Sequence, residues 1–169
     1  MTGHDEKVPP NASFITQPCR ISVVIDQVVL ATDGSESVVR ATTVALDLAD
    51  RFEATVHALY VIDERDVSGV PDDVADELTD ALEREGAQSI ADIEARAHVP
   101  VVTAIRTGRP ALEIDAYARS VDADLVAIGT RGRHGEHRYL LGSVAEAVIE
   151  RCPMPVLVVR QLDSNDAKR

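Results

Sequence analysis

The chain contains no tryptophan, and aromatic residues make up only 3% of its 169 positions. A core built from this sequence must therefore be aliphatic, and a hydrophobic content of 45% is enough to bury one without a metal or a disulfide. The two cysteines, Cys19 and Cys152, lie far apart and do not form a metal-binding pair. Reduced thiols in a cytoplasmic protein are the simplest interpretation.

Long apolar runs are also missing. No stretch reaches the roughly 20 apolar residues that a helix needs to cross a bilayer. Residues 1–10 lack the positive and then apolar layout of a secretory signal. We therefore expect a cytoplasmic protein with no membrane partner.

Lysine occurs only at Lys7 and Lys168, and 29 acidic residues against 17 basic ones give a net charge of −12. This charge opposes binding to nucleic acid and to anionic membranes. Asp-rich, Lys-poor surfaces resemble those of proteins from salt-loving organisms, in which salt screens the repulsion between carboxylates. The melting temperature is then expected to rise with molar KCl, whereas a flat or falling one indicates an ordinary acidic protein.

Five apolar, β-branched runs predict strands buried on both faces of a sheet. The runs cover residues 27–32, 54–62, 99–107, 124–129 and 155–160. Strict alternation of these runs with helical patterns predicts a single-domain α/β fold with a parallel sheet and helices on both faces. In such a sheet, ligands bind beyond the carboxyl ends of the strands, where the winding reverses.

Helical periodicity fills the segments between the runs. Gly86 lies in the middle of the second helix and leaves open whether that helix is unbroken. The fourth helix covers residues 143–151. The residues predicted to face inward are Val38, Ala41, Ala45 and Ala49 in the first helix, Val74, Leu78, Leu82, Ile90 and Ile93 in the second, and Ala111, Ile114, Ala118 and Val121 in the third.

The two ends of the chain differ from its body. Residues 1–23 form a proline-containing extension without periodicity, and residues 161–169 form a polar tail. We interpret residues 24–160 as the folded domain. The extension is either a dispensable arm or a wrongly assigned start, and residues 21–25 either lengthen the first strand or belong to a linker.

A glycine motif follows the fourth predicted strand. It reads Gly129, two residues, Gly132, nine residues, and then Gly142-Ser143 at the start of a helix. Glycines let backbone N–H groups approach a ligand closely, and a helix N-terminus offers unpaired N–H donors. The motif therefore predicts a cradle for phosphate oxygens.

Together with Ala31-Thr32-Asp33-Gly34-Ser35, Val61-Ile62-Asp63 and Gly108-Arg109-Pro110, this motif resembles the universal stress protein family over roughly residues 24–160. The chain is similar to the ATP-binding branch, and in its acidity to halophilic archaeal members. The resemblance implies a Rossmann-like sheet of the adenine nucleotide alpha hydrolase type, in the order 3-2-1-4-5. It also implies a homodimer formed through the last strand.

The resemblance further implies a nucleotide site. Asp33 would accept hydrogen bonds from the ribose or the adenine, and Val61 would flank the ring. The glycine motif would contact ribose and phosphates. The implied nucleotide-binding residues are Ala31, Thr32, Asp33, Val61, Ile128, Gly129, Arg131, Gly132, Gly142, Ser143 and Val144.

Several of these residues have a second interpretation. Ser143 with Glu146 three residues later forms a capping-box sequence, so the serine has a helix-stabilising role as an alternative to phosphate contact. Asp33-Gly34-Ser35 is also typical of a turn and cap. His134 and His137 hint at a metal, but no third ligand is evident, and we assign no metal site.

Arg131, Arg133 and Arg138 are equally consistent with a solvated surface and with phosphate attraction. Glu136 stands where the family often carries an apolar residue, a departure that would weaken phosphate binding. His57 and His98 are assigned structural roles.

The sequence thus predicts an ATP-binding regulatory or stress-response factor, with Mg²⁺ or Mn²⁺ accompanying the phosphates. A nucleotide-independent dimeric interaction module is the alternative, and an enzyme of the related superfamily is a weaker third. Kinases and NTPases pair their glycine cradles with a lysine and metal ligands, and here both lysines lie in the terminal segments. We therefore name no catalytic residue and expect at most slow ATP hydrolysis or autophosphorylation.

Overall fold

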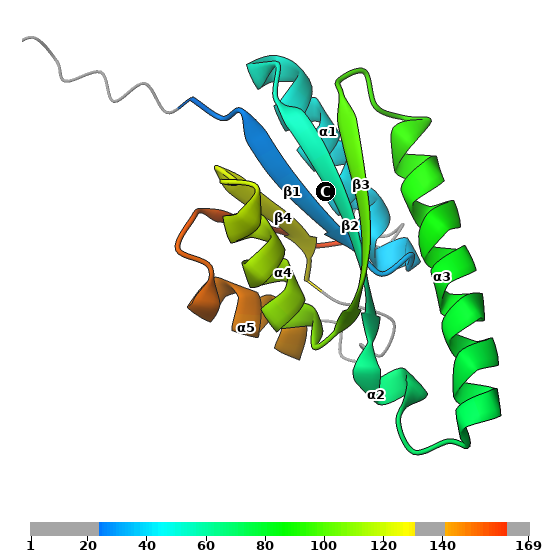
Figure 1. Cartoon of the computed structure of the whole chain (residues 1–169). Helices are drawn as coiled ribbons and strands as arrows, with labels where there is room; N and C mark the ends of the chain where they lie inside the picture. The colour runs from blue at the N-terminus through cyan, green and yellow to red at the C-terminus, as the bar shows by residue number, and fades with distance from the viewer. Residues whose placement is uncertain (1–23, 131–140, 162–169) are drawn as a thin grey trace, which may run out of the picture.

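The computed structural model describes residues 24–130 and 141–161 (Figure 1). Strands and helices alternate along the chain as predicted. The strands are β1 (Gln27–Thr32), β2 (Thr55–Asp63), β3 (Val101–Gly108), β4 (Leu125–Gly129) and β5 (Val156–Val159). The helices are η1 (Glu36–Val38), α1 (Val39–Phe52), α2 (Glu64–Val67), α3 (Asp72–Glu94), α4 (Pro110–Ser120) and α5 (Ser143–Arg151).

The five strands form one sheet in the order β3-β2-β1-β4-β5, and every neighbouring pair is parallel. This order confirms the α/β fold and the topology implied by the resemblance. The chain winds outward from β1 to β3, crosses the sheet, and then winds outward from β4 to β5 (Figure 1). The winding therefore reverses between β1 and β4, where loops from adjacent strands separate and leave room for a ligand.

Alternate residues of the central strands enter two aliphatic clusters on opposite faces of the sheet. One cluster joins Val28 and Leu30 of β1 to residues of α1 and α3. The other joins Val29 and Ala31 to residues of α4 and α5. Burial on both faces is thus confirmed for β1, β2 and β4, but it is wrong for β3 and β5, which lie at the edges of the sheet. Val102 and Ile105 of β3 are exposed, and only Val159 of β5 is fully buried.

Helix α3 is one unbroken helix, and Gly86 has a packing role within it. A Cβ atom built at Gly86 would lie 2.6 Å from Cδ1 of the Tyr60 ring, and Tyr60 on β2 is only 3% exposed. Glycine thus lets the helix backbone approach the aromatic ring closely.

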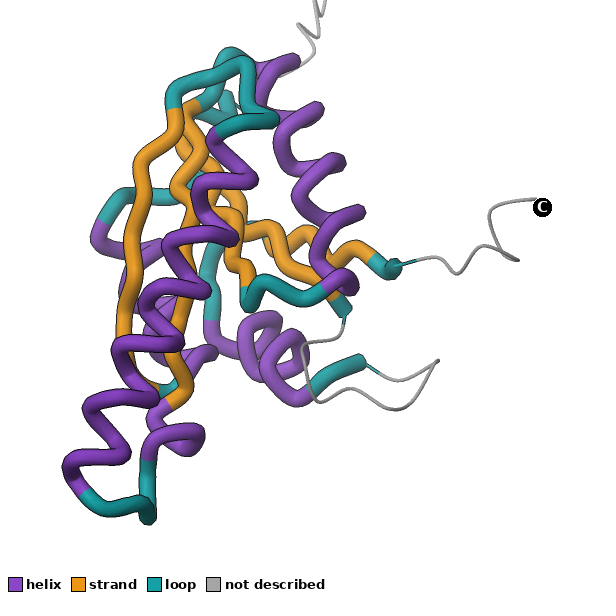
Figure 2. Tube along the Cα trace, turned by 90° about the vertical axis from the view of Figure 1, so that its right-hand side faces the viewer, coloured by secondary structure: helices purple, strands orange, loops and turns teal. Residues whose placement is uncertain are grey.

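The inward stripe predicted for this helix is correct only in its second half. Ile90 and Ile93 are buried, but Val74 is 45% exposed and Leu78 is only half-buried. The first turns of α3 extend past the ends of the strands, so no sheet surface is available to cover them (Figure 2). No helix among the described residues is both long enough and apolar enough to span a membrane.

Candidate functional site

A pocket of about 530 Å³ opens at the carboxyl ends of the strands. It is lined by the ends of β1, β2 and β4 and by the first turns of α4 and α5. All the predicted nucleotide-binding residues that the structure describes line this one pocket, namely Ala31, Thr32, Asp33, Val61, Ile128, Gly129, Gly142, Ser143 and Val144. Arg131 and Gly132 lie outside the described residues, as do Arg133, His134, Glu136, His137 and Arg138.

Asp33 lines the pocket and orders the turn after β1. Its Oδ1 accepts hydrogen bonds from the backbone N–H of Ser35 at 3.0 Å and from the Ser35 hydroxyl at 2.7 Å. The Thr32 hydroxyl accepts the N–H of Gly34 at 3.1 Å. The turn part of the interpretation is therefore confirmed, whereas Ser35, the N-cap of η1, makes no side-chain capping hydrogen bond. The same turn brings Asp33 to the pocket lining.

The start of α5 supplies the opposite wall. Gly142 is the N-cap with an extended backbone (φ −70°, ψ 151°), and the N–H of Glu146 donates to the Gly142 carbonyl at 2.9 Å. Ser143 is consequently the first helical residue, one position too late for the serine of a capping box. The capping-box interpretation is wrong. The first N–H groups of α5 have no partner within the helix and lie at the pocket, where Ser143, Val144 and Ala145 form part of its lining.

Thr130 connects this helix end to the sheet. Its N–H donates to the carbonyl of Val159 in β5 at 3.1 Å, and its carbonyl accepts the N–H of Gly142 at 2.8 Å. The residue lines the pocket but was missed by the sequence reasoning. Its position inside the glycine motif was the available signal.

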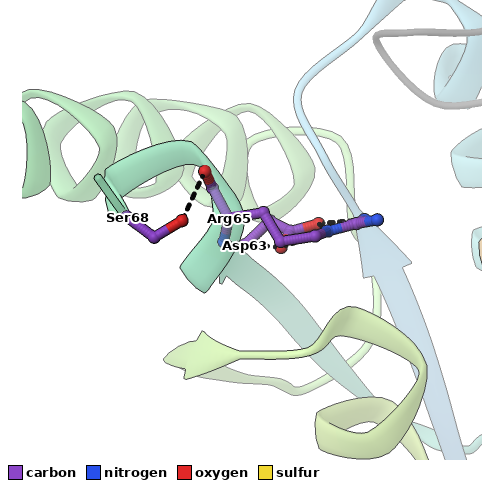
Figure 3. A network of polar contacts seen from close by, with 3 residues as sticks. All are labelled: Asp63, Arg65 and Ser68. Carbon is purple, nitrogen blue, oxygen red and sulfur yellow. Dashed lines mark hydrogen bonds and ion pairs between the residues drawn. The ribbon is translucent and has the colours of Figure 1, made fainter. Parts of the chain in front are cut away.

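A second feature that sequence reasoning missed is an ion pair between Asp63 and Arg65 (Figure 3). Asp63 ends β2 and caps α2, because its Oδ1 accepts the backbone N–H of Arg65 at 3.0 Å. The Arg65 Nε lies 2.9 Å from Oδ1 and 3.0 Å from Oδ2, and Nη2 also donates to Oδ2. This hydrogen bonding and the charge of Asp63 raise the pKa of Arg65 above its ordinary value.

The pocket is electrically uneven. Asp33, Asp63 and Asp66 line the β1 and β2 side, where Arg65 forms an ion pair with Asp63. The positive end of the α5 dipole faces the pocket from the β4 side, where anions are favoured. Val61, Pro110 and Ile114 give the acidic side an apolar wall. The arrangement suits an elongated ligand with an uncharged, flat end and an anionic end.

His57 lies away from this pocket, near the start of β2, and its structural assignment agrees with its contacts. It is buried, with Nδ1 3.0 Å from the Tyr117 hydroxyl and Nε2 2.8 Å from the Gln27 amide oxygen. Because an amide oxygen only accepts, Nε2 carries the proton and Nδ1 accepts from Tyr117. Arg106 lies over the Tyr117 ring at 5.1 Å and pairs with Glu113 at 3.9 Å.

Burial lowers the pKa of His57 below its ordinary value of 6.5, which makes stability depend on pH. Protonation favours the unfolded chain, so the contribution of His57 is present above about pH 6.5 and is lost as the pH falls toward the folded-state pKa. We expect His57→Gln to flatten the fall in unfolding free energy between pH 7 and 5, by at most about 1.4 kcal/mol per pH unit. Denaturant titrations check this, with His98→Gln as the exposed control. Equal slopes for wild type and His57→Gln would contradict the assignment.

The chain is similar to known proteins in both sequence and structure. The model of the universal stress protein family matches residues 25–160. A universal stress protein of Methanocaldococcus jannaschii is 38% identical over 139 residues, which are 80% of this chain and 82% of that protein. The solved structure of the hypothetical protein MJ0577 is 29% identical, covers 83% of this chain and 99% of its own, and has a TM-score of 0.75.

A universal stress protein crystallised in complex with cAMP is 26% identical, with a TM-score of 0.59. It covers 81% of this chain and 98% of its own. An adenine nucleotide is thus bound by one solved structure with this fold.

Proposed function

The chain belongs to the universal stress protein family, and from this premise we propose that it is a regulatory protein that binds ATP in the pocket at the carboxyl ends of β1, β2 and β4. The proposal rests on the fact that residues far apart in the sequence meet at one pocket. Residues as distant in sequence as Asp33, Val61 and Ser143 line one pocket of about 530 Å³. This volume falls within the range of small-molecule sites.

The chemistry of the two walls supports an adenine nucleotide in one orientation. Val61, Pro110 and Ile114 line the pocket and would offer apolar surface to the base, and the Asp33 carboxylate would accept hydrogen bonds from adenine or ribose donors. The N–H groups at the start of α5 lie across the pocket, where they would donate to phosphate oxygens. Mg²⁺ or Mn²⁺ would enter with the phosphates. The cAMP-bound relative supports the same ligand class.

ATP titration by calorimetry tests the proposal. We expect saturable binding by wild type and roughly tenfold weaker binding by Asp33→Asn, because a hydrogen bond to a charged group is lost. The asparagine keeps one oxygen for the Ser35 bonds, so the turn is preserved. Asp47→Asn removes the same charge from the exposed outer face of α1 and is expected to bind like wild type.

Absence of saturable binding by the wild type would favour the nucleotide-independent interaction module instead. Turnover of labelled ATP well above background would be required before the protein is called an enzyme. We also propose that two copies associate through β5, the strand at one edge of the sheet. Light scattering giving the 18.2 kDa mass of a single chain would contradict this.

A further inference from the structure

The Asp63–Arg65 pair differs from an ordinary surface ion pair, because one partner is largely buried and the carboxylate binds two nitrogens of the guanidinium. Arg65 is 71% exposed, whereas Asp63 is only 15% exposed, and both line the pocket. Nε and Nη2 of Arg65 are both bonded to the carboxylate, which fixes the plane of the guanidinium. Among the described residues, no hydrogen bond is made by the remaining terminal nitrogen, Nη1, and the guanidinium stays open to a ligand.

The position of the pair indicates which end of a ligand it would meet. Arg65 follows β2, only four residues after Val61, and lies on the acidic and apolar side of the pocket. The N-terminus of α5 is on the other side. With three carboxylates nearby, this side is unfavourable for phosphate, because like charges repel. A planar guanidinium held by a carboxylate is instead well suited to lie on the face of an aromatic ring.

We propose that Arg65, oriented by Asp63, stacks on the base of the bound nucleotide and sets affinity for the base rather than for the phosphates. The inference rests on the proposed function, because it places the base at the β2 side of the same pocket. Asp63 acts through Arg65 and is a positioning residue.

Titrations with adenosine, AMP and ATP test the inference. Arg65→Ala is expected to weaken all three ligands by the same factor, about 3- to 30-fold. Arg65→Lys keeps the positive charge but lacks the planar guanidinium, and it is expected to recover little of the affinity that Arg65→Ala loses. Asp63→Asn keeps an oxygen for the cap of α2 but loses the ion pair. It is expected to weaken binding less than Arg65→Ala does, and by the same factor for adenosine, AMP and ATP.

Arg84→Ala, on the exposed side of α3, is the control and is expected to bind like wild type. A loss that grows from adenosine to ATP would overturn the inference in favour of a phosphate contact. Unchanged binding by Arg65→Ala, with saturable binding by wild type, would overturn the inference alone. A wild-type protein that binds none of the three ligands would overturn the proposed function and this inference together.

Discussion

Replacement of Ser143 by proline is expected to leave the protein folded while weakening ATP binding by roughly 10- to 100-fold. Proline is well tolerated as the first residue of a helix, because its missing N–H has no partner in the helix there. The chain already uses this arrangement in α4, which begins at Pro110. Gly142 has the extended conformation that a residue before proline requires (φ −70°, ψ 151°). The substitution therefore removes the proposed phosphate donors of Ser143 at little cost to the helix.

Ser143→Ala separates the two donors that the proline removes together, since alanine lacks the hydroxyl but keeps the N–H. A smaller loss of ATP affinity for alanine than for proline would assign the larger contact to the backbone. Adenosine, which has no phosphate, is expected to bind both variants like wild type. Equal weakening of adenosine and ATP by Ser143→Pro, or no weakening of either, would contradict the placement of phosphates at α5.

Gly86→Val is expected to lower the melting temperature by about 6–12 °C, which corresponds to about 3 kcal/mol for a chain of this size. A Cβ at this position would lie 2.6, 2.9 and 3.0 Å from three carbon atoms of the Tyr60 ring. The ring is buried, so it can move only by disturbing the cluster between the sheet and α3. The better helix propensity of valine recovers only a few tenths of a kcal/mol.

Ala87→Val is the matched control for this prediction. It places the same β-branched side chain one residue further along α3, at an exposed position where no ring must move. Differential scanning calorimetry of both variants separates the steric effect from helix propensity. Equal melting temperatures for the two variants would contradict the close approach of α3 to Tyr60.

The central sheet was predictable from sequence because its strands are buried on both faces. Residues 28–31, an unbroken aliphatic run, enter both clusters alternately, which only a covered central strand allows. The position of β3 at the edge of the sheet was not predictable. Val102 and Ile105 are apolar residues of the kind found in buried strands, yet they are exposed because β3 lies at the edge. The exposure of Val74 was equally hidden, since helical periodicity carries no information on where the sheet ends.

The candidate site, too, was predictable from sequence only in part. The pocket positions of Asp33 and Ser143 could be anticipated, because a motif and the rule of strand ends both indicated them. The Arg65 side chain could not, because Asp63 and Arg65 are two residues apart at the junction of a strand and a short helix. Neither helical nor strand periodicity predicts that these two side chains meet. They meet because Asp63 caps α2 and accepts the backbone N–H of Arg65. Whether Ser143 is the helix cap also required the structure, since the answer depends on a shift of one residue in the start of α5.

The two backbone hydrogen bonds of Thr130 have a thermodynamic consequence. They connect the carbonyl of Val159 on an edge strand to the N–H of Gly142 at the pocket. If two copies associate through β5, nucleotide binding and self-association share this connection. Reciprocity then requires that ATP change the dimerisation constant by the same factor by which dimerisation changes ATP affinity. Coupling through this connection would make the measured affinity for nucleotide vary with protein concentration.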